Sequence, residues 1–204
     1  MILIGQLDSP FVRRVAVTMR LMGMSYERRP LSVFADYDVV RDINPLARVP
    51  ILILDDGEVL VDSTPILDHL DENAGPDRAL VPPDGPERRQ VLRLVAIALG
   101  ACEKGAALVY EREKRPPEKV YEPWAARLEG QIESALEALE AVEPAPWLAG
   151  ARMTQADVTT AVLYDFLRFY HLHLLPAGRY PRLEALAARC AELPAFAEVP
   201  VVAA

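Results

Sequence analysis

Residues 2–11 read ILIGQLDSPF, and this short stretch decides how the chain begins to fold. The apolar run Ile2–Ile4 predicts a buried strand, and the proline at residue 10 suits the first turn of a helix. From Pro10 to about Met22 the apolar residues recur at helical spacing. A second extended stretch, Tyr26–Leu31, comes next. The chain therefore begins as strand, helix and strand.

A hairpin and another helix follow. Val49–Leu54 is a β-rich apolar run that ends at a turn signal, Asp55-Asp56-Gly57, and Glu58–Val61 is its expected partner strand. Thr64–Glu72 then has the pattern of a helix. A strand–helix–strand unit followed by strand, strand and helix predicts an α/β domain at residues 1–73, with helices packed on a small mixed sheet.

The rest of the chain has a helical pattern. Residues 74–86 gather six Gly and Pro residues, a composition that disfavours regular structure, so we interpret them as an inter-domain linker. Beyond it, apolar residues repeat at three- and four-residue steps, with Phe166 and Phe169 expected to face inward. The predicted helices cover Val91–Cys102, Leu128–Val142, Thr154–Tyr170 and Pro181–Cys190. They predict an all-α domain at residues 87–204.

Composition limits the classes of function. Hydrophobic residues make up 51% of the 204, enough to bury a sizeable core. Lys and Arg number 22 against 30 Asp and Glu, and this net charge of −8 argues against binding nucleic acid, whose phosphates must be neutralised by clustered cations. Two distant cysteines, Cys102 and Cys190, suit a reducing cytoplasm better than a disulfide framework. No signal peptide or membrane span is expected.

Ser9 stands where the first strand passes into the first helix. Because Pro10 takes the first helical position, Ser9 falls at the N-cap, beside backbone N–H groups that have no helical partner. A plain capping role explains this position. The same hydroxyl and N–H groups, at the positive end of a helix dipole, would also suit an anion such as a ligand's thiolate.

Val49-Pro50 lies at the mouth of a buried strand, where a proline would break the ladder of hydrogen bonds. A cis bond would resolve the conflict, although cis bonds make up only about 5–6% of X-Pro bonds, so position alone favours a trans loop proline. With Val49 extended, its N–H and C=O would face outward. They could then pair with a peptide-like ligand as an added strand.

Asp62-Ser63 opens the next helix and places a second serine near a helix N-terminus. Capping again explains the pattern. A functional reading is also open, because exposed N–H groups with Ser63 would suit a carboxylate and Asp62 would suit an ammonium group. Together they would hold an amino-acid zwitterion.

Three segments, in this order and spacing, resemble the glutathione transferase family: SPFVRRV at 9–15, NPLARVPIL at 44–52 and DSTPIL at 62–67. The likeness continues through WLAG at 147–150, MTQADV at 153–158 and YPRL at 180–183, so it covers nearly the whole chain. Ser-Pro-Phe at the first helix is similar to the serine-type bacterial and plant members. The resemblance implies a thioredoxin-like N-terminal domain that carries the glutathione site, an all-α C-terminal domain that lines the co-substrate site, and usually a homodimer.

The resemblance also implies residue roles. Ser9 would be catalytic, with its hydroxyl hydrogen-bonded to the glutathione sulfur. Val49, before a cis Pro50, would pair with the cysteinyl backbone, and Asp62 with Ser63 would hold the γ-glutamyl end. The implied glutathione-binding residues are Ser9, Phe11, Val49, Pro50, Asp62 and Ser63. The residues expected to line an apolar co-substrate pocket are Phe11, Tyr110 and Tyr170.

The expected reaction uses glutathione as co-substrate and needs no metal. A free thiol titrates near about pH 8.5, so Ser9 and the helix dipole would have to stabilise the thiolate at neutral pH. The thiolate would then attack a small electrophilic, hydrophobic substrate in an apolar cleft between the domains. His171 and His173 lie two apart with no third ligand nearby, so a metal site is not expected.

Two other readings stay open. Thiol–disulfide exchange needs a protein cysteine at the first helix, where this chain has Ser9. A glutathione-binding or protein-interaction module with little catalytic activity would keep the same fold, because function resides in sites.

The chain also departs from the family's pattern at a few positions. Asp62 stands where Glu is commoner, which shortens the reach to the amino group and could lower affinity modestly. Arg48 follows Ala47 where Gly-Lys is usual, which stiffens the turn before Pro50. Thr154 and Asp157, by contrast, fit the family's capping motif for a helix of the second domain.

Overall fold

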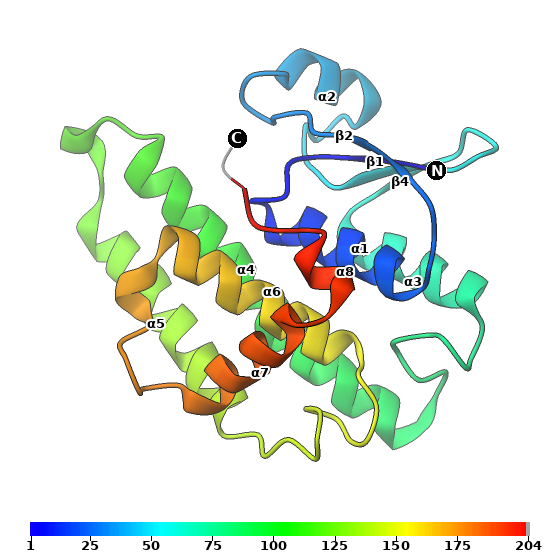
Figure 1. Ribbon diagram of the computed structural model, residues 1–204. Helices are drawn as coiled ribbons and strands as arrows, with labels where there is room; N and C mark the ends of the chain where they lie inside the picture. Colours follow the sequence, from blue (N-terminus) through cyan, green and yellow to red (C-terminus); the bar gives the residue numbers. More distant parts are fainter. Residues whose placement is uncertain (203–204) are drawn as a thin grey trace. The chain divides into compact units, whose positions relative to one another are not determined.

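A computed structural model describes residues 1–202 of the chain (Figure 1). The chain divides into two compact units. The first is made of Met1–Pro83 together with the segment that begins at Ala191, and the second is Asp84–Cys190.

The first unit contains a mixed four-stranded sheet in the order β2-β1-β3-β4. Its strands are β1 (Ile2–Ile4), β2 (Glu27–Arg29), β3 (Ile51–Ile53) and β4 (Val59–Val61). β1 pairs in parallel with β2 and antiparallel with β3, and β3 pairs antiparallel with β4. The predicted strands and the predicted mixed sheet are therefore confirmed: β1 has the predicted bounds, and the other three strands are shorter than predicted.

Helices cover both faces of this sheet. α1 (Pro10–Leu21) and α3 (Ser63–Ala74) lie on one side, and α2 (Tyr37–Ile43) lies on the other (Figure 1). Side chains alternate along a strand, so Ile4 and Ile51 pack with Val40 of α2 in one core cluster. The sequence pattern does not predict α2. Val40 is its only buried residue, so the helix has no apolar periodicity to detect.

The C-terminal segment packs on α1. It contains α8 (Pro194–Ala197), which contacts α1 within the same unit. The buried Nε of Arg13 donates to the carbonyl of Val199 at 2.8 Å, and its guanidinium lies 5.8 Å from the ring centroid of Phe196. The predicted helical domain at 87–204 thus differs from the compact unit, which ends at Cys190.

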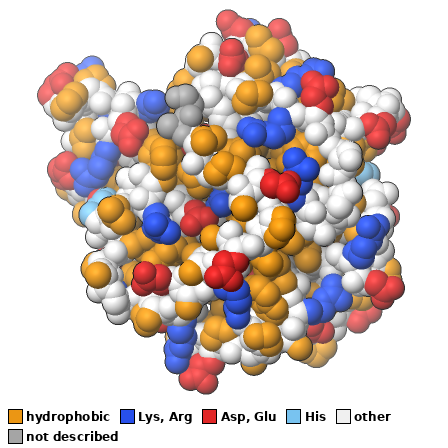
Figure 2. Space-filling view, viewed as in Figure 1, with side chains coloured by type: hydrophobic (Ala, Val, Ile, Leu, Met, Phe, Trp, Pro, Cys, Tyr) orange, Lys and Arg blue, Asp and Glu red, His pale blue; other side chains and the backbone are white. Residues whose placement is uncertain are grey.

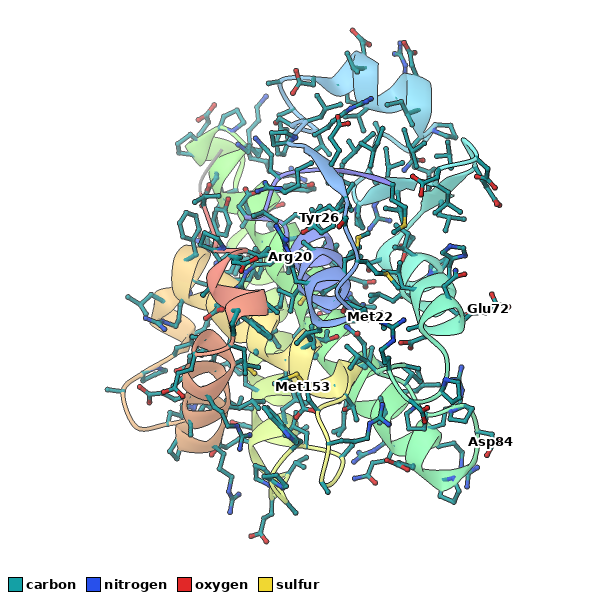
Figure 3. All side chains as sticks on the ribbon, turned by 45° about the vertical axis from the view of Figure 1, so that its right-hand side comes forward. Arg20, Met22, Tyr26, Glu72, Asp84 and Met153 are labelled. Atoms are coloured by element: carbon teal, nitrogen blue, oxygen red, sulfur yellow. The ribbon has the colours of Figure 1, made fainter. Side chains whose placement is uncertain are left out.

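A second arginine of α1 adds to this contact. Arg20 pairs with Glu198 at 3.6 Å, and its guanidinium lies 5.5 Å from the ring centroid of Tyr26 (Figure 3). Burial raises the pKa of the Tyr26 hydroxyl above its ordinary value, against the opposing effect of Arg20. The phenol therefore stays neutral, and its hydroxyl donates to the carbonyl of Ala16 at 3.4 Å.

The second unit is helical. Its α-helices are α4 (Gly85–Glu113), α5 (Glu122–Glu140), α6 (Gln155–Tyr170) and α7 (Pro181–Ala191), with short 3-10 turns η1 (Pro117–Lys119) and η2 (Leu172–Leu174). α4 packs against both α5 and α6. All four predicted helices are present. The expectation for Phe169 is wrong, because its side chain is 45% exposed, whereas Phe166 is buried.

The predicted capping motif of α6 is confirmed. One carboxylate oxygen of the fully buried Asp157 accepts from the backbone N–H of Thr154 at 2.8 Å and from its hydroxyl at 3.0 Å. The other oxygen accepts from the N–H of Leu148 at 2.8 Å. Desolvation raises the pKa of Asp157, and these donors oppose the rise. The carboxyl group thereby fixes the start of α6 to the loop before it.

On the face shown in Figure 2, Lys and Arg side chains are interspersed with Asp and Glu, so that face has no continuous basic patch. Within residues 1–202, every helix is too short or too polar to cross a membrane. Cys102 and Cys190 are both buried and are not joined in a disulfide.

Candidate functional site

Ser9 is the N-cap of α1, as predicted. Its Oγ accepts from the backbone N–H of Val12 at 3.4 Å, and Pro10 occupies the first turn. The side chain is half-buried. A hydroxyl that accepts one hydrogen bond still has its own hydrogen to donate, and no acceptor for that hydrogen occurs in the part of the chain that the structure describes. Ser9 can therefore donate to an anion placed at the start of α1.

The turn before β3 is organised by Asn44, a residue whose role the sequence pattern did not indicate. Its buried amide donates to the carbonyl of Arg48 at 2.8 Å and accepts from the N–H of Leu46 at 3.1 Å. Ala47 in this turn has a φ of 47°, a left-handed conformation that usually favours Gly or Asn. The side chain of Asn44, by its hydrogen bonds across the turn, sets the direction in which the chain enters β3.

The Val49–Pro50 bond is cis, as the family resemblance implied. Val49 is half-buried and precedes β3, and its backbone N–H and C=O have no backbone partner within residues 1–202. These groups are thus available to pair with an extended ligand, in the manner of an added strand.

Gly5 lies against Val49 and allows the turn to approach α1. Its φ is +130°, and a Cβ built on it would lie 2.9 Å from the Cβ of Val49 and 2.5 Å from Cγ2 of Val12. Any side chain at residue 5 would have to displace both of them. Because glycine has no side chain, Val49 can lie close to the first turn of α1.

Asp62 and Ser63 occupy the start of α3. Asp62, an exposed residue with a φ of 71°, is the N-cap, and its Oδ1 accepts from the N–H of Thr64 at 2.9 Å. Ser63 is buried, and its Oγ accepts from NH1 of Arg14 at 3.5 Å. The capping residue is thus Asp62, whereas Ser63 is the first residue of the helix.

These segments surround one small cavity in the first unit. The residues that line it are Phe11, Asn44, Leu46, Arg48, Val49, Pro50, Val61, Asp62 and Ser63. Five of the six predicted glutathione-binding residues are among them. The sixth, Ser9, does not line the cavity but lies two residues before Phe11 on the same helix start. Ser63, Asp62 and Arg48 thus place a hydroxyl, a carboxylate and a guanidinium residue around one space.

The three residues predicted to line the co-substrate pocket lie in different units of the chain. Phe11 belongs to the first unit, whereas Tyr110 in α4 and Tyr170 at the end of α6 belong to the second. Tyr110 is 49% exposed. The ring of Tyr170 packs on Phe166 and Phe169, with centroid separations of 5.3 and 4.8 Å. A pocket shared by Phe11 and the two tyrosines stays a prediction.

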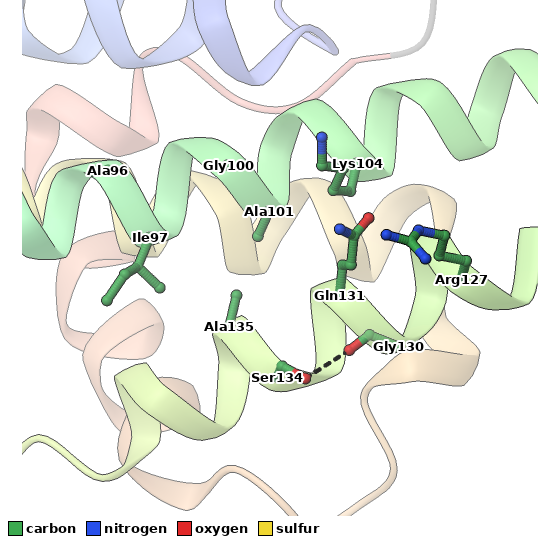
Figure 4. A pocket seen from close by; sticks show the side chains of 10 residues that line it. All are labelled: Ala96, Ile97, Gly100, Ala101, Lys104, Arg127, Gly130, Gln131, Ser134 and Ala135. Atoms are coloured by element: carbon green, nitrogen blue, oxygen red, sulfur yellow. Dashed lines mark hydrogen bonds between the residues drawn. The ribbon is translucent and has the colours of Figure 1, made fainter. Parts of the chain in front are cut away.

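A larger cavity, of about 530 Å³, lies between α4 and α5 (Figure 4). Its lining contains two cations, Lys104 and Arg127, and mostly small residues otherwise. The hydroxyl of Ser134 in this lining donates to the carbonyl of Gly130 at 2.9 Å. None of the predicted site residues lines this cavity.

The two histidines of the second unit do not lie in a metal-binding cluster. The described residues contain no group of three or more His, Cys, Asp or Glu side chains that could hold a metal ion. His171 is buried, and its Nε2 donates to the carbonyl of Gly105 at 2.9 Å. Burial lowers the pKa of His171, so the ring is neutral near pH 7. His173 is exposed and contacts Glu129 at 3.3 Å.

Comparison with known proteins defines the class of protein. The family model of the glutathione S-transferase N-terminal domain matches residues 3–78, and the family model of the C-terminal domain matches residues 122–189. Maleylacetoacetate isomerase of Pseudomonas aeruginosa is 30% identical over 192 residues, which cover 90% of this chain and 87% of that protein.

Solved structures agree with this class. A glutathione S-transferase of Methylobacterium radiotolerans, in complex with glutathione sulfonate, has a TM-score of 0.92 at 27% identity and covers 100% of this chain and 96% of its own. A glutathione transferase family member from Pseudomonas fluorescens, with bound glutathione, has a TM-score of 0.89 at 30% identity and covers 99% of each chain. The chain belongs to the glutathione S-transferase family, and its N-terminal part has the thioredoxin-like fold.

Proposed function

We propose that the protein is a serine-type glutathione transferase, in which Ser9 stabilises the thiolate of bound glutathione for attack on a small electrophile. One observation supports this proposal most strongly: the turn before β3 and the start of α3 line one cavity with Phe11, two residues beyond Ser9. The similar structures from Methylobacterium and Pseudomonas hold glutathione sulfonate and glutathione, which supports glutathione as the ligand.

Two parts of the tripeptide, the cysteinyl backbone and the γ-glutamyl end, have matching groups. The free N–H and C=O of Val49 would pair with the cysteinyl backbone, and the cis bond to Pro50 directs the chain away into β3. The carboxylate of the γ-glutamyl end would accept from the hydroxyl and the backbone N–H of Ser63 at the start of α3. The exposed carboxylate of Asp62 would attract the neighbouring ammonium group.

The chemistry follows from the position of Ser9. A free thiol titrates near about pH 8.5, and each unit by which its pKa falls corresponds to about 1.4 kcal/mol of thiolate stabilisation. Ser9 donates its hydroxyl hydrogen to sulfur, and the positive end of the α1 dipole adds to the stabilisation. The sulfur then forms a bond to the electrophilic carbon as the leaving group departs or the double bond is opened. Ser9 is a donor in this step and takes no proton.

Binding and turnover test the proposal separately. Calorimetric titration with glutathione measures binding, and a panel of aryl halides, isothiocyanates, enones and hydroperoxides measures turnover. We expect glutathione to bind and at least one of these four classes of electrophile to be consumed. Binding without turnover of any class would support the alternative, a glutathione-binding or interaction module.

The likeness to maleylacetoacetate isomerase favours a second candidate reaction. A thiolate can add to a conjugated carbon–carbon double bond, allow rotation about the resulting single bond, and leave again, so glutathione is regenerated. The same stabilised thiolate would serve this chemistry. Conversion of a cis unsaturated acid to its trans isomer, with the concentration of glutathione unchanged, would distinguish isomerase from transferase activity.

We further propose a homodimer in the cytoplasm, with Phe11, Tyr110 and Tyr170 lining the co-substrate pocket. The family resemblance supports the dimer, and the two buried cysteines, which are not joined in a disulfide, fit a reducing compartment. The mass in solution, measured by light scattering, tests the dimer.

A further inference from the structure

A buried arginine, Arg14, contacts Ser63, one of the residues that line the small cavity. Arg14 of α1 is 2% exposed and is among the largest fully buried side chains of the chain. Its NH1 donates to Oγ of Ser63, the first residue of α3, at 3.5 Å. A buried guanidinium needs acceptors for its N–H groups. The hydroxyl of Ser63 supplies one of them, and the bond joins α1 to the start of α3.

This bond constrains which way the Ser63 hydroxyl can point. A serine hydroxyl carries one hydrogen to donate and two lone pairs that accept. With an Arg14 N–H at one lone pair, the hydroxyl hydrogen must be directed elsewhere. Ser63 also lines the small cavity beside Val49 and Asp62. Among residues 1–202 no acceptor for this hydrogen is found, so an anion in the cavity can accept it.

The charge of Arg14 acts in the same direction. It stands behind the hydroxyl, in a buried environment where charge interactions are screened less than in water. A carboxylate in the cavity would thus meet an oriented donor with a cation behind it. Both effects favour an anion over a neutral group at this end of the cavity.

We infer that Arg14 is a positioning residue for ligand recognition: it fixes the Ser63 hydroxyl as a donor to the α-carboxylate of the γ-glutamyl group. This inference rests on the proposed function, because it takes glutathione as the ligand of the cavity. Arg14 itself does not line the cavity. It acts through Ser63.

The test compares two ligands by calorimetric titration. One is glutathione, and the other is 4-aminobutyryl-cysteinylglycine, which lacks only the α-carboxylate. In Arg14→Met we expect glutathione to bind about tenfold more weakly, the size of a lost hydrogen bond to a charged group, with the affinity for the analogue nearly unchanged. kcat at saturating glutathione should stay within about twofold.

A double-mutant cycle separates positioning from a general loss of structure. If Arg14 acts through Ser63, Arg14→Met adds no further loss of glutathione affinity in a Ser63→Ala background. Arg14→Lys, which keeps the charge without the guanidinium, should show part of the loss and serves as the variant if Arg14→Met does not fold. Arg13→Met is a matched control, because Arg13 is its equally buried neighbour on α1 but bonds Val199. It should leave the ratio of the two affinities unchanged.

The outcomes distinguish this inference from the proposed function. Failure of the wild-type protein to bind glutathione overturns the proposed function and this inference with it. Binding by the wild type, combined with equal losses for both ligands in the Arg14 variants or additive losses in the cycle, overturns the inference alone.

Discussion

The backbone N–H of Val12 donates to Oγ of Ser9 at 3.4 Å, so the hydroxyl that caps α1 accepts this bond and keeps its own hydrogen. A single serine can therefore stabilise the helix and donate to a ligand's sulfur at once. The two roles make different predictions, because capping affects folding whereas donation affects the reaction.

Replacing Ser9 by Ala should lower kcat by about 10-fold near pH 7, since the sulfur loses the hydroxyl's share of the one to two pKa units of thiolate stabilisation that Ser9 and the helix dipole supply together. The KM for glutathione should stay nearly unchanged. Steady-state kinetics with any electrophile from the panel measures both. Ser9→Thr keeps the hydroxyl and should recover most of the activity. Unchanged turnover in Ser9→Ala would remove Ser9 from the mechanism.

Gly5→Ala should disturb the Val49 turn. The added Cβ would fall 2.9 Å from Cβ of Val49 and 2.5 Å from Cγ2 of Val12, so both side chains must move. We expect a loss of about 1–3 kcal/mol in the free energy of unfolding and a higher KM for glutathione. Gly23→Ala is the matched control, because residue 23 has a φ of +65° but nothing within 4 Å of its Cβ. It should cost about 1 kcal/mol of strain without changing KM. Equal effects on KM in both variants would contradict a specific role for the Gly5–Val49 approach.

Gly105 of α4 gives a test within the helical unit. A Cβ there would lie 2.6 Å from Cε1 of Phe166, whereas a Cβ at Gly130 of α5 would meet nothing within 4 Å. Although alanine is the better helix former, Gly105→Ala should destabilise the protein by about 1–3 kcal/mol through the clash. Gly130→Ala should instead stabilise it by about 0.5–1 kcal/mol. Chemical denaturation measures both. Stabilisation by both variants would show that α4 and α6 are less closely packed than described.

His171 predicts a pH dependence of stability. Burial lowers its pKa in the folded protein, and the ring donates to the Gly105 carbonyl as the neutral form. The unfolded chain, with an ordinary pKa of about 6.5, therefore binds protons first as the pH falls. The stabilisation that comes from the neutral His171 ring is present above about pH 6.5 and is lost as the pH falls toward the lowered pKa of the folded state. Unfolding free energies at several pH values should decline less steeply in His171→Gln than in the wild type. Equal slopes in the wild type and in His171→Gln would contradict this role of the buried ring.

The sequence predicts the first unit well where apolar runs are bounded by turn signals. β1, α1 and the β3–β4 hairpin follow directly from their patterns, and the Ser9 cap from Pro10 after it. α2 has a single buried residue, Val40, so its pattern carries no signal. The C-terminal segment packs on α1 through Arg13 and Val199, a contact between residues 186 positions apart that no local pattern contains.

The candidate site likewise contains residues that local motifs predict and residues that only the folded structure reveals. Val49, Pro50, Asp62 and Ser63 belong to local motifs, and the structure brings them to one cavity. Asn44 and Arg14 act through side-chain bonds to Arg48 and Ser63, and such bonds depend on the folded arrangement. The inward placement expected for Phe169 is wrong, because the buried residues of α6 end at Leu167 and the side chain of Phe169 is exposed.

The pKa of the glutathione thiol in the bound state tests the central claim most directly. Ultraviolet absorbance of the thiolate, followed against pH with the protein in excess, measures it for the wild type and for Ser9→Ala. We expect a value one to two units below the free thiol's pKa of about 8.5 in the wild type and a return toward 8.5 in the variant. A bound thiol that titrates as the free one does, in a protein that binds glutathione, would contradict the account.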